Sequence, residues 1–135
     1  MHRPILPALL PALLALAGCA TPEADPFISD AIGRCTYVNA FNDRNECKEY
    51  LGSAWTQEAM EDNCAAAVPG SDPGLLELDL GCQREELLGV CVVDPGTVEA
   101  NTIFFLDGPG YDCSGLAVGC SFAGGQYEPA AACGG

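Results

Sequence analysis

The stretch VCVVDPGTVEANTIFFL, residues 90–106, contains two apolar runs separated by a turn sequence. Val90–Val93 and Val98–Leu106 are rich in β-branched and aromatic residues, which favour extended strands. Asp94-Pro95-Gly96-Thr97 lies between them and is typical of a turn. The pattern therefore predicts a β-hairpin.

The cysteines around this hairpin predict a disulfide framework. None of the nine cysteines forms a Cys-x-x-Cys pair, and the shortest spacing, Cys113 to Cys120, leaves six residues between them. Zinc ribbons and thioredoxin-like sites need closer pairs, so structural disulfides are favoured. Many pairings remain open, because spacing alone does not choose among them. Four disulfides are expected among Cys35, Cys47, Cys64, Cys82, Cys91, Cys113, Cys120 and Cys133.

Two segments before the hairpin carry helix signals. Asp43 is placed as an N-cap, with Glu46 three residues later and Gly52 as a stop signal. Thr56 is placed as the N-cap of a second helix that runs towards Ala67, with acidic residues near its start. We therefore expect a short helical hairpin before the strands and a closing strand at residues 121–123 after them.

Together these signals predict a small disulfide-rich α+β domain over residues 34–135. Its expected architecture is a short helical hairpin followed by a small antiparallel sheet of two or three strands, with four disulfides. The chain is long enough for one domain and too short for two with substantial cores. Residues 19–33 are rich in proline and acidic residues, which is typical of an extended tether.

The first eighteen residues have the layout of a signal peptide. Arg3 precedes an uncharged apolar run, Ile5–Ala17, which is 13 residues long. A spanning helix needs about 20 residues, so a permanent transmembrane anchor is not expected. The run leads into Leu16-Ala17-Gly18-Cys19, which resembles a bacterial lipobox. Residues 1–18 are therefore predicted to be a lipoprotein signal peptide; the alternative is an ordinary secretory signal that happens to contain a cysteine.

Lipidation of Cys19 also accounts for the odd number of cysteines. Committing Cys19 to acyl chains leaves eight cysteines, an even number, for disulfides. Several acyl chains on one residue hold a protein durably at a bilayer. Ala20, rather than aspartate, follows Cys19, which resembles the arrangement in outer-membrane lipoproteins of Gram-negative bacteria. The expected location is therefore the bacterial outer membrane or cell surface, with the lipid bilayer as a partner through the acylated Cys19.

Charge restricts the other partners. The formal net charge is −14, and it becomes −15 once residues 1–18, which contain Arg3 and no acid, are removed. Such a surface repels the phosphate backbone, so nucleic-acid binding is excluded. Cationic proteins or divalent ions are favourable partners, although acidic charge also serves solubility. An envelope protein is the partner expected.

No residue pattern points to catalysis, and no catalytic residue is assigned. The single histidine, His2, lies in the predicted signal peptide, which excludes imidazole chemistry from the mature chain. Carboxylate pairs such as Glu61-Asp62 and Glu85-Glu86 are more typical of solvated surface. The acidic turn at residues 107–112 lacks EF-hand spacing, so no metal site and no cofactor are expected.

The aromatic residues are expected to fill the core rather than form an exposed patch. Phe104 and Phe105 are adjacent on a predicted strand, so their side chains must point to opposite faces. We expect one of the two to remain accessible to a partner. The aromatic residues considered are Tyr37, Tyr50, Trp55, Phe104, Phe105 and Tyr127.

Two segments also echo each other within the chain. Cys47-x-x-Tyr50-x-Gly52-x-x-Trp55 precedes Cys64, and Cys120-x-Phe122-x-Gly124-x-x-Tyr127 precedes Cys133. The match is imperfect by one residue, so chance and a duplicated unit both remain open.

Scattered motifs over the mature domain resemble small cysteine-rich lipoproteins of myxobacteria and their relatives. They are Cys35-Thr36-Tyr37-Val38-Asn39, Glu46-Cys47-Lys48-Glu49-Tyr50-Leu51-Gly52, Trp55-Thr56, Gly89-Val90-Cys91-Val92-Val93, and Gly124-Gly125 before Cys133. The resemblance implies a surface location and supplies no catalytic residues.

Two classes of function remain. The first is a non-enzymatic structural or protein-interaction module, anchored in the envelope or at the cell surface. The second is a membrane-tethered protease inhibitor or small hydrolase. The first is favoured, because it requires no residue that the chain lacks.

Overall fold

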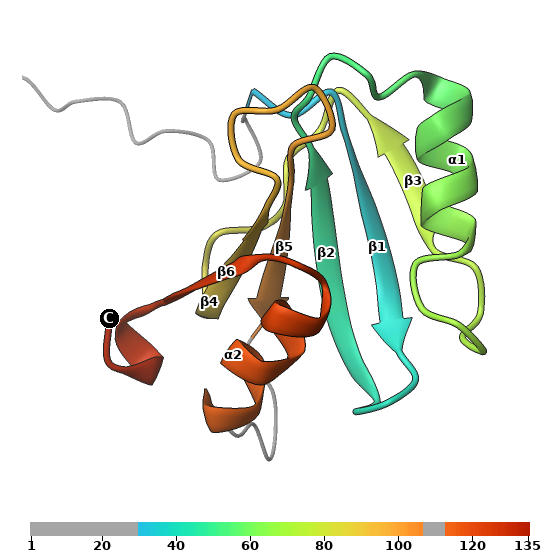
Figure 1. Ribbon diagram of the computed structural model, residues 1–135. Coiled ribbons are helices and arrows are strands. Elements are labelled where there is room, and N and C mark those ends of the chain that lie inside the picture. The colour runs from blue at the N-terminus through green and yellow to red at the C-terminus, as the bar shows by residue number, and fades with distance from the viewer. Residues whose placement is uncertain (1–29, 107–112) are drawn as a thin grey trace, which may run out of the picture.

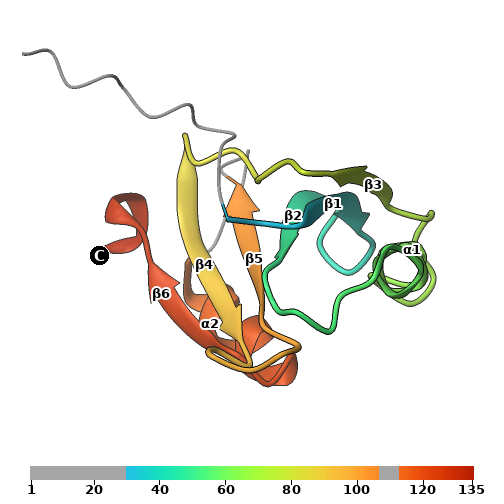
Figure 2. The same ribbon diagram turned by 90° about the horizontal axis from the view of Figure 1, so that it is seen from above.

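The computed structural model describes residues 30–106 and 113–135, which form one antiparallel sheet with two helices on one of its faces (Figures 1 and 2). The elements are β1 (Gly33–Asn39), β2 (Arg44–Tyr50), α1 (Gln57–Ala65), β3 (Leu75–Leu78), β4 (Leu87–Val93), β5 (Asn101–Leu106), α2 (Cys113–Phe122), β6 (Gln126–Pro129) and the 3-10 turn η1 (Ala131–Cys133). The strand order is β3-β1-β2-β5-β4-β6. The protein is therefore a small disulfide-rich α+β domain, as expected, but its sheet has six strands.

The predicted helix after Asp43 is wrong, because Arg44–Tyr50 is strand β2. β2 lies between β1 and β5 and pairs antiparallel with both, so tertiary partners supply its backbone hydrogen bonds. Asp43 adopts a φ of 55° in the β1–β2 turn rather than a helix cap. Both faces of this strand are covered, since Cys47 is buried on one face and Tyr50 on the other.

The second predicted helix is confirmed as α1. Thr56 Oγ1 accepts a hydrogen bond from the Ala59 amide at 3.2 Å, which satisfies a backbone donor in the first turn. Met60 and Cys64 are its buried residues. The helix ends at Ala65, two residues before the expected end.

The predicted hairpin is confirmed as β4 and β5, which pair antiparallel from Leu87↔Leu106 to Val93↔Asn101. Its connection is longer than expected, because Val98 and Ala100 do not join β5. Their carbonyls instead accept hydrogen bonds from the Ala54 amide at 2.8 Å and the Gly52 amide at 3.0 Å. The loop is therefore held against the chain that leads into α1.

The closing strand is present but begins later than expected. Residues 121–123 lie at the end of α2, not in a strand. Gly124, at a φ of 76°, follows the helix, and β6 begins at Gln126. Positive φ is strained for most side chains, so the glycine permits the sharp turn that ends the helix.

The chain is built from two structurally equivalent halves. β1-β2-α1-β3 and β4-β5-α2-β6 have the same order, and β2 of the first half pairs antiparallel with β5 of the second. The registers match as well: Cys35 pairs with Lys48 in the first half and Cys91 with Ile103 in the second, and Lys48 pairs with Ile103 across the centre of the sheet. One cross-strand row traverses the sheet through Leu76, Cys35, Lys48, Ile103, Cys91 and Tyr127.

The two halves also share a disulfide and a glycine. Cys35–Cys64 joins β1 to α1, and Cys91–Cys120 joins β4 to α2, each with a sequence separation of 29. After each helix, a glycine amide donates to the helix cysteine carbonyl: Gly74 to Cys64 at 3.1 Å and Gly125 to Cys120 at 3.0 Å. The structure therefore contains the same arrangement of strands, helix and disulfide twice.

The two segments that echo each other in the sequence do not occupy equivalent places in the two halves. Cys47–Trp55 covers a strand and a loop, whereas Cys120–Tyr127 covers a helix end and a strand, so that alignment is wrong. The structurally equivalent segments are Gly33-Arg34-Cys35 and Gly89-Val90-Cys91. In the sequence, the repeat is visible in this Gly-x-Cys pattern and in the equal separation of 29 residues to the paired helix cysteine.

Gly74 and Gly125, the glycines that follow the two helices, allow the disulfides between sheet and helix to lie close to the backbone. A Cβ atom at Gly125 would lie 2.5 Å from Cys91 Sγ. We expect Gly125→Ala to lower the free energy of unfolding by about 1–3 kcal/mol, as overpacking does. Gly115→Ala in α2 is the matched control, because its Cβ meets nothing within 4 Å and alanine favours a helix. Urea unfolding of both variants under non-reducing conditions tests this; equal stability of the two would contradict it.

Candidate functional site

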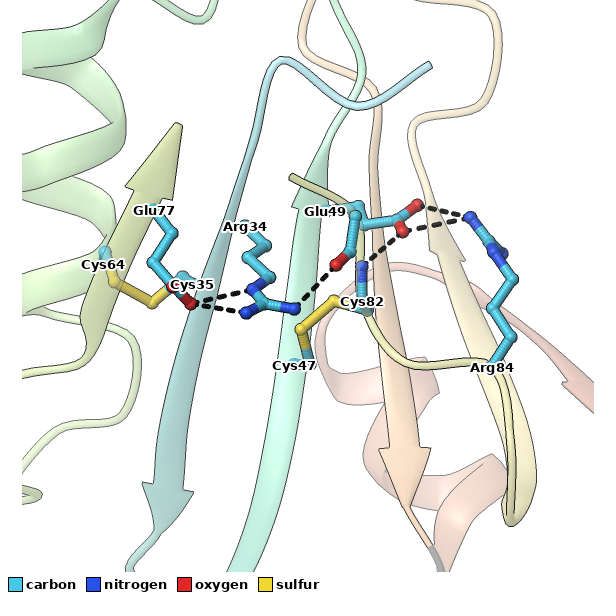
Figure 3. The surroundings of a disulfide bond; sticks show 9 residues. Arg34, Cys35, Cys47, Glu49, Cys64, Glu77, Cys82 and Arg84 are labelled. Carbon is cyan, nitrogen blue, oxygen red and sulfur yellow. Dashed lines mark hydrogen bonds and ion pairs between the residues drawn. A yellow bond between two sulfur atoms is a disulfide. The ribbon is translucent and has the colours of Figure 1, made fainter. Parts of the chain in front are cut away.

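The face of the sheet opposite the helices is closed by the segment that connects the two halves (Figure 3). The disulfide Cys47–Cys82 attaches this segment to β2. Glu49, only 2% exposed, accepts hydrogen bonds from the Cys82 amide at 2.7 Å and from Arg84 at 3.0 and 3.1 Å. The Arg84 guanidinium also lies 4.8 Å from the centre of the Phe104 ring.

A second ion pair extends this cluster to the sheet edge. Arg34 contacts Glu77 of β3 at 2.7 Å and donates to the Gly81 carbonyl at 2.9 Å (Figure 3). The arginines therefore bind the protein's own carboxylates and carbonyls. We interpret this face as structural, because its charged groups are engaged by one another.

The helix face contains a groove of about 1050 Å³. One wall is the chain leaving α1 at Ala67–Pro69, and the other is α2. The groove separates two hydrophobic clusters, one beneath α1 around Met60 and one beneath α2 around Leu116. It is lined by Tyr37, Asn39, Phe41, Asn42, Arg44, Glu46, Ala67, Val68, Pro69, Ile103, Phe105, Gly115, Leu116, Gly119, Cys120, Phe122 and Ala123.

Glu46 is a buried carboxylate in the floor of this groove. It is 5% exposed and lies in register between Tyr37 and Phe105 on the neighbouring strands. Asn39 Nδ2 donates to its Oε1 at 2.8 Å. Within residues 30–106 and 113–135, that is the side-chain hydrogen bond its carboxylate receives, although a carboxylate has room for several donors.

Lys48 lies two residues further along β2 on the same face. Its Nζ donates to Asn63 Oδ1 at 3.0 Å, which directs the ammonium towards α1. Burial lowers the pKa of Lys48, and the nearby charge of Glu46 partly offsets that effect. The Tyr50 hydroxyl donates to the same Asn63 oxygen at 3.0 Å. Asn63 therefore anchors two polar groups of β2 beneath α1.

Burial of Tyr50 predicts alkaline sensitivity. Burial raises the pKa of Tyr50 to about 12 from 10.0, so the folded state holds this proton more tightly than the unfolded state. The contribution of this proton to the free energy of unfolding is complete below pH 10. It falls by about 2–3 kcal/mol as pH rises towards 12. The lowered pKa of Lys48 acts in the opposite sense, because loss of its proton favours the folded state. Tyr50→Phe should remove the Tyr50 share of the alkaline loss.

The measurement is the free energy of unfolding in urea between pH 8 and 11.5, with short exposures to protect the disulfides. Parallel pH profiles for the wild type and Tyr50→Phe would contradict this assignment.

The predicted disulfide cysteines all form bridges. The pairs are Cys35–Cys64, Cys47–Cys82, Cys91–Cys120 and Cys113–Cys133, with S–S distances of 1.97, 1.95, 2.02 and 2.07 Å. Cys19, the predicted lipidation site, lies outside the described residues, as does the acidic turn at residues 107–112.

The carboxylate pairs considered for catalysis do not line the groove. Glu61 and Asp62 are exposed on α1, and Glu85 and Glu86 are exposed on the segment before β4. In the described part of the chain, no three His, Cys, Asp or Glu side chains gather closely enough to hold a metal ion. Neither helix in that part is long and apolar enough to cross a bilayer.

The aromatic residues are largely internal, as expected. Tyr37, Tyr50, Phe104 and Phe105 are each at most 8% exposed. Phe104 and Phe105 do lie on opposite faces, but the expected exposure of one of them is wrong. The segment bearing Cys82 covers Phe104, and α2 covers Phe105.

Two phenylalanines that the sequence did not assign to a binding surface are exposed at the groove. Phe41 is 81% exposed and Phe122 is 88% exposed. A sequence signal for this surface exists, because residues 113–127 contain no charged residue in an otherwise acidic chain. This uncharged run covers α2, which ends at the exposed Phe122.

Comparisons of this chain with protein-family models, with curated proteins and with solved structures give no match.

Proposed function

We propose that this chain is the precursor of a lipid-anchored lipoprotein of the bacterial outer membrane or cell surface. Its domain acts as a non-enzymatic structural or protein-interaction module. The observation that carries the proposal is the sequence Leu16-Ala17-Gly18-Cys19 directly after an apolar run. This pattern suits removal of residues 1–18 and acylation of Cys19.

The disulfides support the proposal in two ways. They engage eight of the nine cysteines, which leaves Cys19 for another chemistry. Stable disulfides are also typical of proteins outside the reducing cytoplasm. Four bridges in so small a domain suit an exposed envelope location.

The surface supports a binding role over a chemical one. The groove is lined mainly by apolar side chains with one buried carboxylate, Glu46, in its floor. Pockets of this composition suit recognition of another molecule. The net charge of −15 after residue 18 keeps the domain away from an anionic membrane surface and leaves it accessible to partners.

Mass spectrometry of the protein purified from its own membrane tests the anchor. We expect loss of residues 1–18, acyl mass on Cys19 and no free thiol among the other eight cysteines. Cys19→Ser should abolish both the acyl mass and the cleavage, whereas Ala20→Ser should leave both intact. A wild-type protein cleaved elsewhere, or carrying no acyl mass, would favour an ordinary secretory signal instead.

A further inference from the structure

We propose that the groove between α2 and the chain leaving α1 binds a cationic, apolar peptide segment of another protein, whose Lys or Arg side chain pairs with Glu46. This inference deepens the proposed function and rests on the interaction role of the domain, not on its lipid anchor. Three properties of the groove support it: a helix wall without large side chains, an apolar lining and the single side-chain hydrogen bond of Glu46. The small number of basic residues in the chain is a fourth argument.

The α2 wall allows close approach of another backbone. Gly115 and Gly119 both line the groove, one helical turn apart. A Cβ at either position would meet nothing within 4 Å, so no side chain of the described protein covers this strip of helix. A peptide can therefore lie directly against α2, which a wall of large side chains would prevent.

The lining supplies apolar contact for such a peptide. Ile103, Phe105 and Leu116 form the inner surface. Phe41 and Phe122 stand at the groove with 81% and 88% of their surface exposed. Burial of exposed aromatic rings is a strong source of binding energy, and phenylalanines at an interface commonly act as anchors.

The floor supplies a site for one positive charge. Glu46 is 5% exposed and receives one side-chain hydrogen bond in the described part of the chain, from Asn39. Two basic residues flank Glu46 on the same face of β2: Lys48 is held by Asn63, and Arg44 lines the groove. An incoming ammonium or guanidinium group would complete the pairing of Glu46 with a charge-assisted hydrogen bond, which is strong where water is excluded.

The same charges indicate that the occupant is a different protein. Beyond residue 18 this chain has four basic residues, Arg34, Arg44, Lys48 and Arg84. Arg34, Lys48 and Arg84 bind side chains of their own domain, and Arg44 lines the groove itself. A second copy of this acidic chain is therefore poorly equipped to supply the cation, whereas a basic partner is also attracted by the net charge.

Fluorescence anisotropy with three labelled peptides tests the proposal. Each has seven residues, with leucine and phenylalanine flanking a central lysine, glutamine or glutamate. The full chain is processed by its host; it is held in nanodiscs of neutral phosphatidylcholine if it is acylated and assayed in solution if it is not. We expect the lysine peptide to bind about tenfold more tightly than the glutamine peptide, and the glutamate peptide to bind most weakly.

Three variants locate the binding. Glu46→Gln keeps the size and the acceptor for Asn39, and it should reduce the preference for lysine over glutamine to about onefold. Gly119→Leu fills the groove and should weaken all three peptides. Ala117→Leu adds the same side chain to an exposed position of α2 that does not line the groove, and it should leave binding unchanged.

Equal affinity for the three peptides, an unchanged lysine preference in Glu46→Gln, or no binding at all would overturn the groove assignment. Loss of binding in Ala117→Leu would overturn it as well, since the contact would then lie outside the groove. The lipid anchor is scored separately by acyl mass on Cys19. An acylated protein that binds no peptide defeats only this inference, and a non-acylated protein that prefers the lysine peptide defeats only the anchor.

Discussion

Replacing both Cys47 and Cys82 by alanine is expected to lower the free energy of unfolding by about 4 kcal/mol. Their bridge closes a loop with a sequence separation of 35, and loops of this size contribute about that much by restricting the unfolded chain. Both cysteines are at most 3% exposed, so removal of their sulfur atoms also leaves unfilled volume against Phe104. The loss should be seen as a lower midpoint in urea without reduction.

The matched control is the pair Cys113→Ala and Cys133→Ala. That bridge closes a shorter loop, with a separation of 20, and neither cysteine is fully buried. Its removal should cost about 3 kcal/mol or less. If this control were as destabilising as loss of Cys47–Cys82, attachment of the connecting segment to β2 would not have the importance assigned to it.

Glu49→Ala is expected to be the most damaging substitution at a single charged residue, at about 2–3 kcal/mol. The carboxylate is 2% exposed and accepts from the Cys82 amide and from Arg84. Its loss leaves the Cys82 amide buried without an acceptor and Arg84 without its partner. Arg84 is 44% exposed on its side chain, so water can solvate it and the cost stays below that of a fully buried pair.

Two further variants separate these contributions. Glu49→Gln keeps an acceptor for the Cys82 amide and should be milder than Glu49→Ala. Arg84→Ala should cost about 1 kcal/mol, because the exposed arginine contributes an ion pair and packing over Phe104. The comparison is made by urea unfolding of all three variants. An equal cost for Arg84→Ala and Glu49→Ala would show that the ion pair, not the buried amide, dominates.

The two helices illustrate how far local signals reach. Thr56 caps α1 as its sequence predicts, because a cap hydrogen bond joins residues only three apart. Asp43 and Glu46 offered a similar signal, yet that segment is strand β2. The difference is tertiary: β1 and β5 flank Arg44–Tyr50 and provide hydrogen bonds along both of its edges.

The candidate groove was not predictable from the residues singled out in the sequence. Glu46 appeared there as part of a helix cap, Phe122 only as part of the internal echo, and Phe41 was not considered. Their proximity depends on the sheet register, which sets Glu46 between Tyr37 and Phe105, and on the return of α2 to the same face as α1. The uncharged run at residues 113–127 was the available signal.

The sequence by itself determined the small disulfide-rich α+β class, the hairpin of β4 and β5, the cap of α1 and the parity of the cysteines. Each depends on composition or on residues close together in the chain. Only the tertiary structure decided the disulfide pairs, the strand at Arg44–Tyr50, the duplicated halves and the groove around Glu46. The physical reason is that these features depend on which distant segments pair across the sheet, and local propensities do not encode that choice.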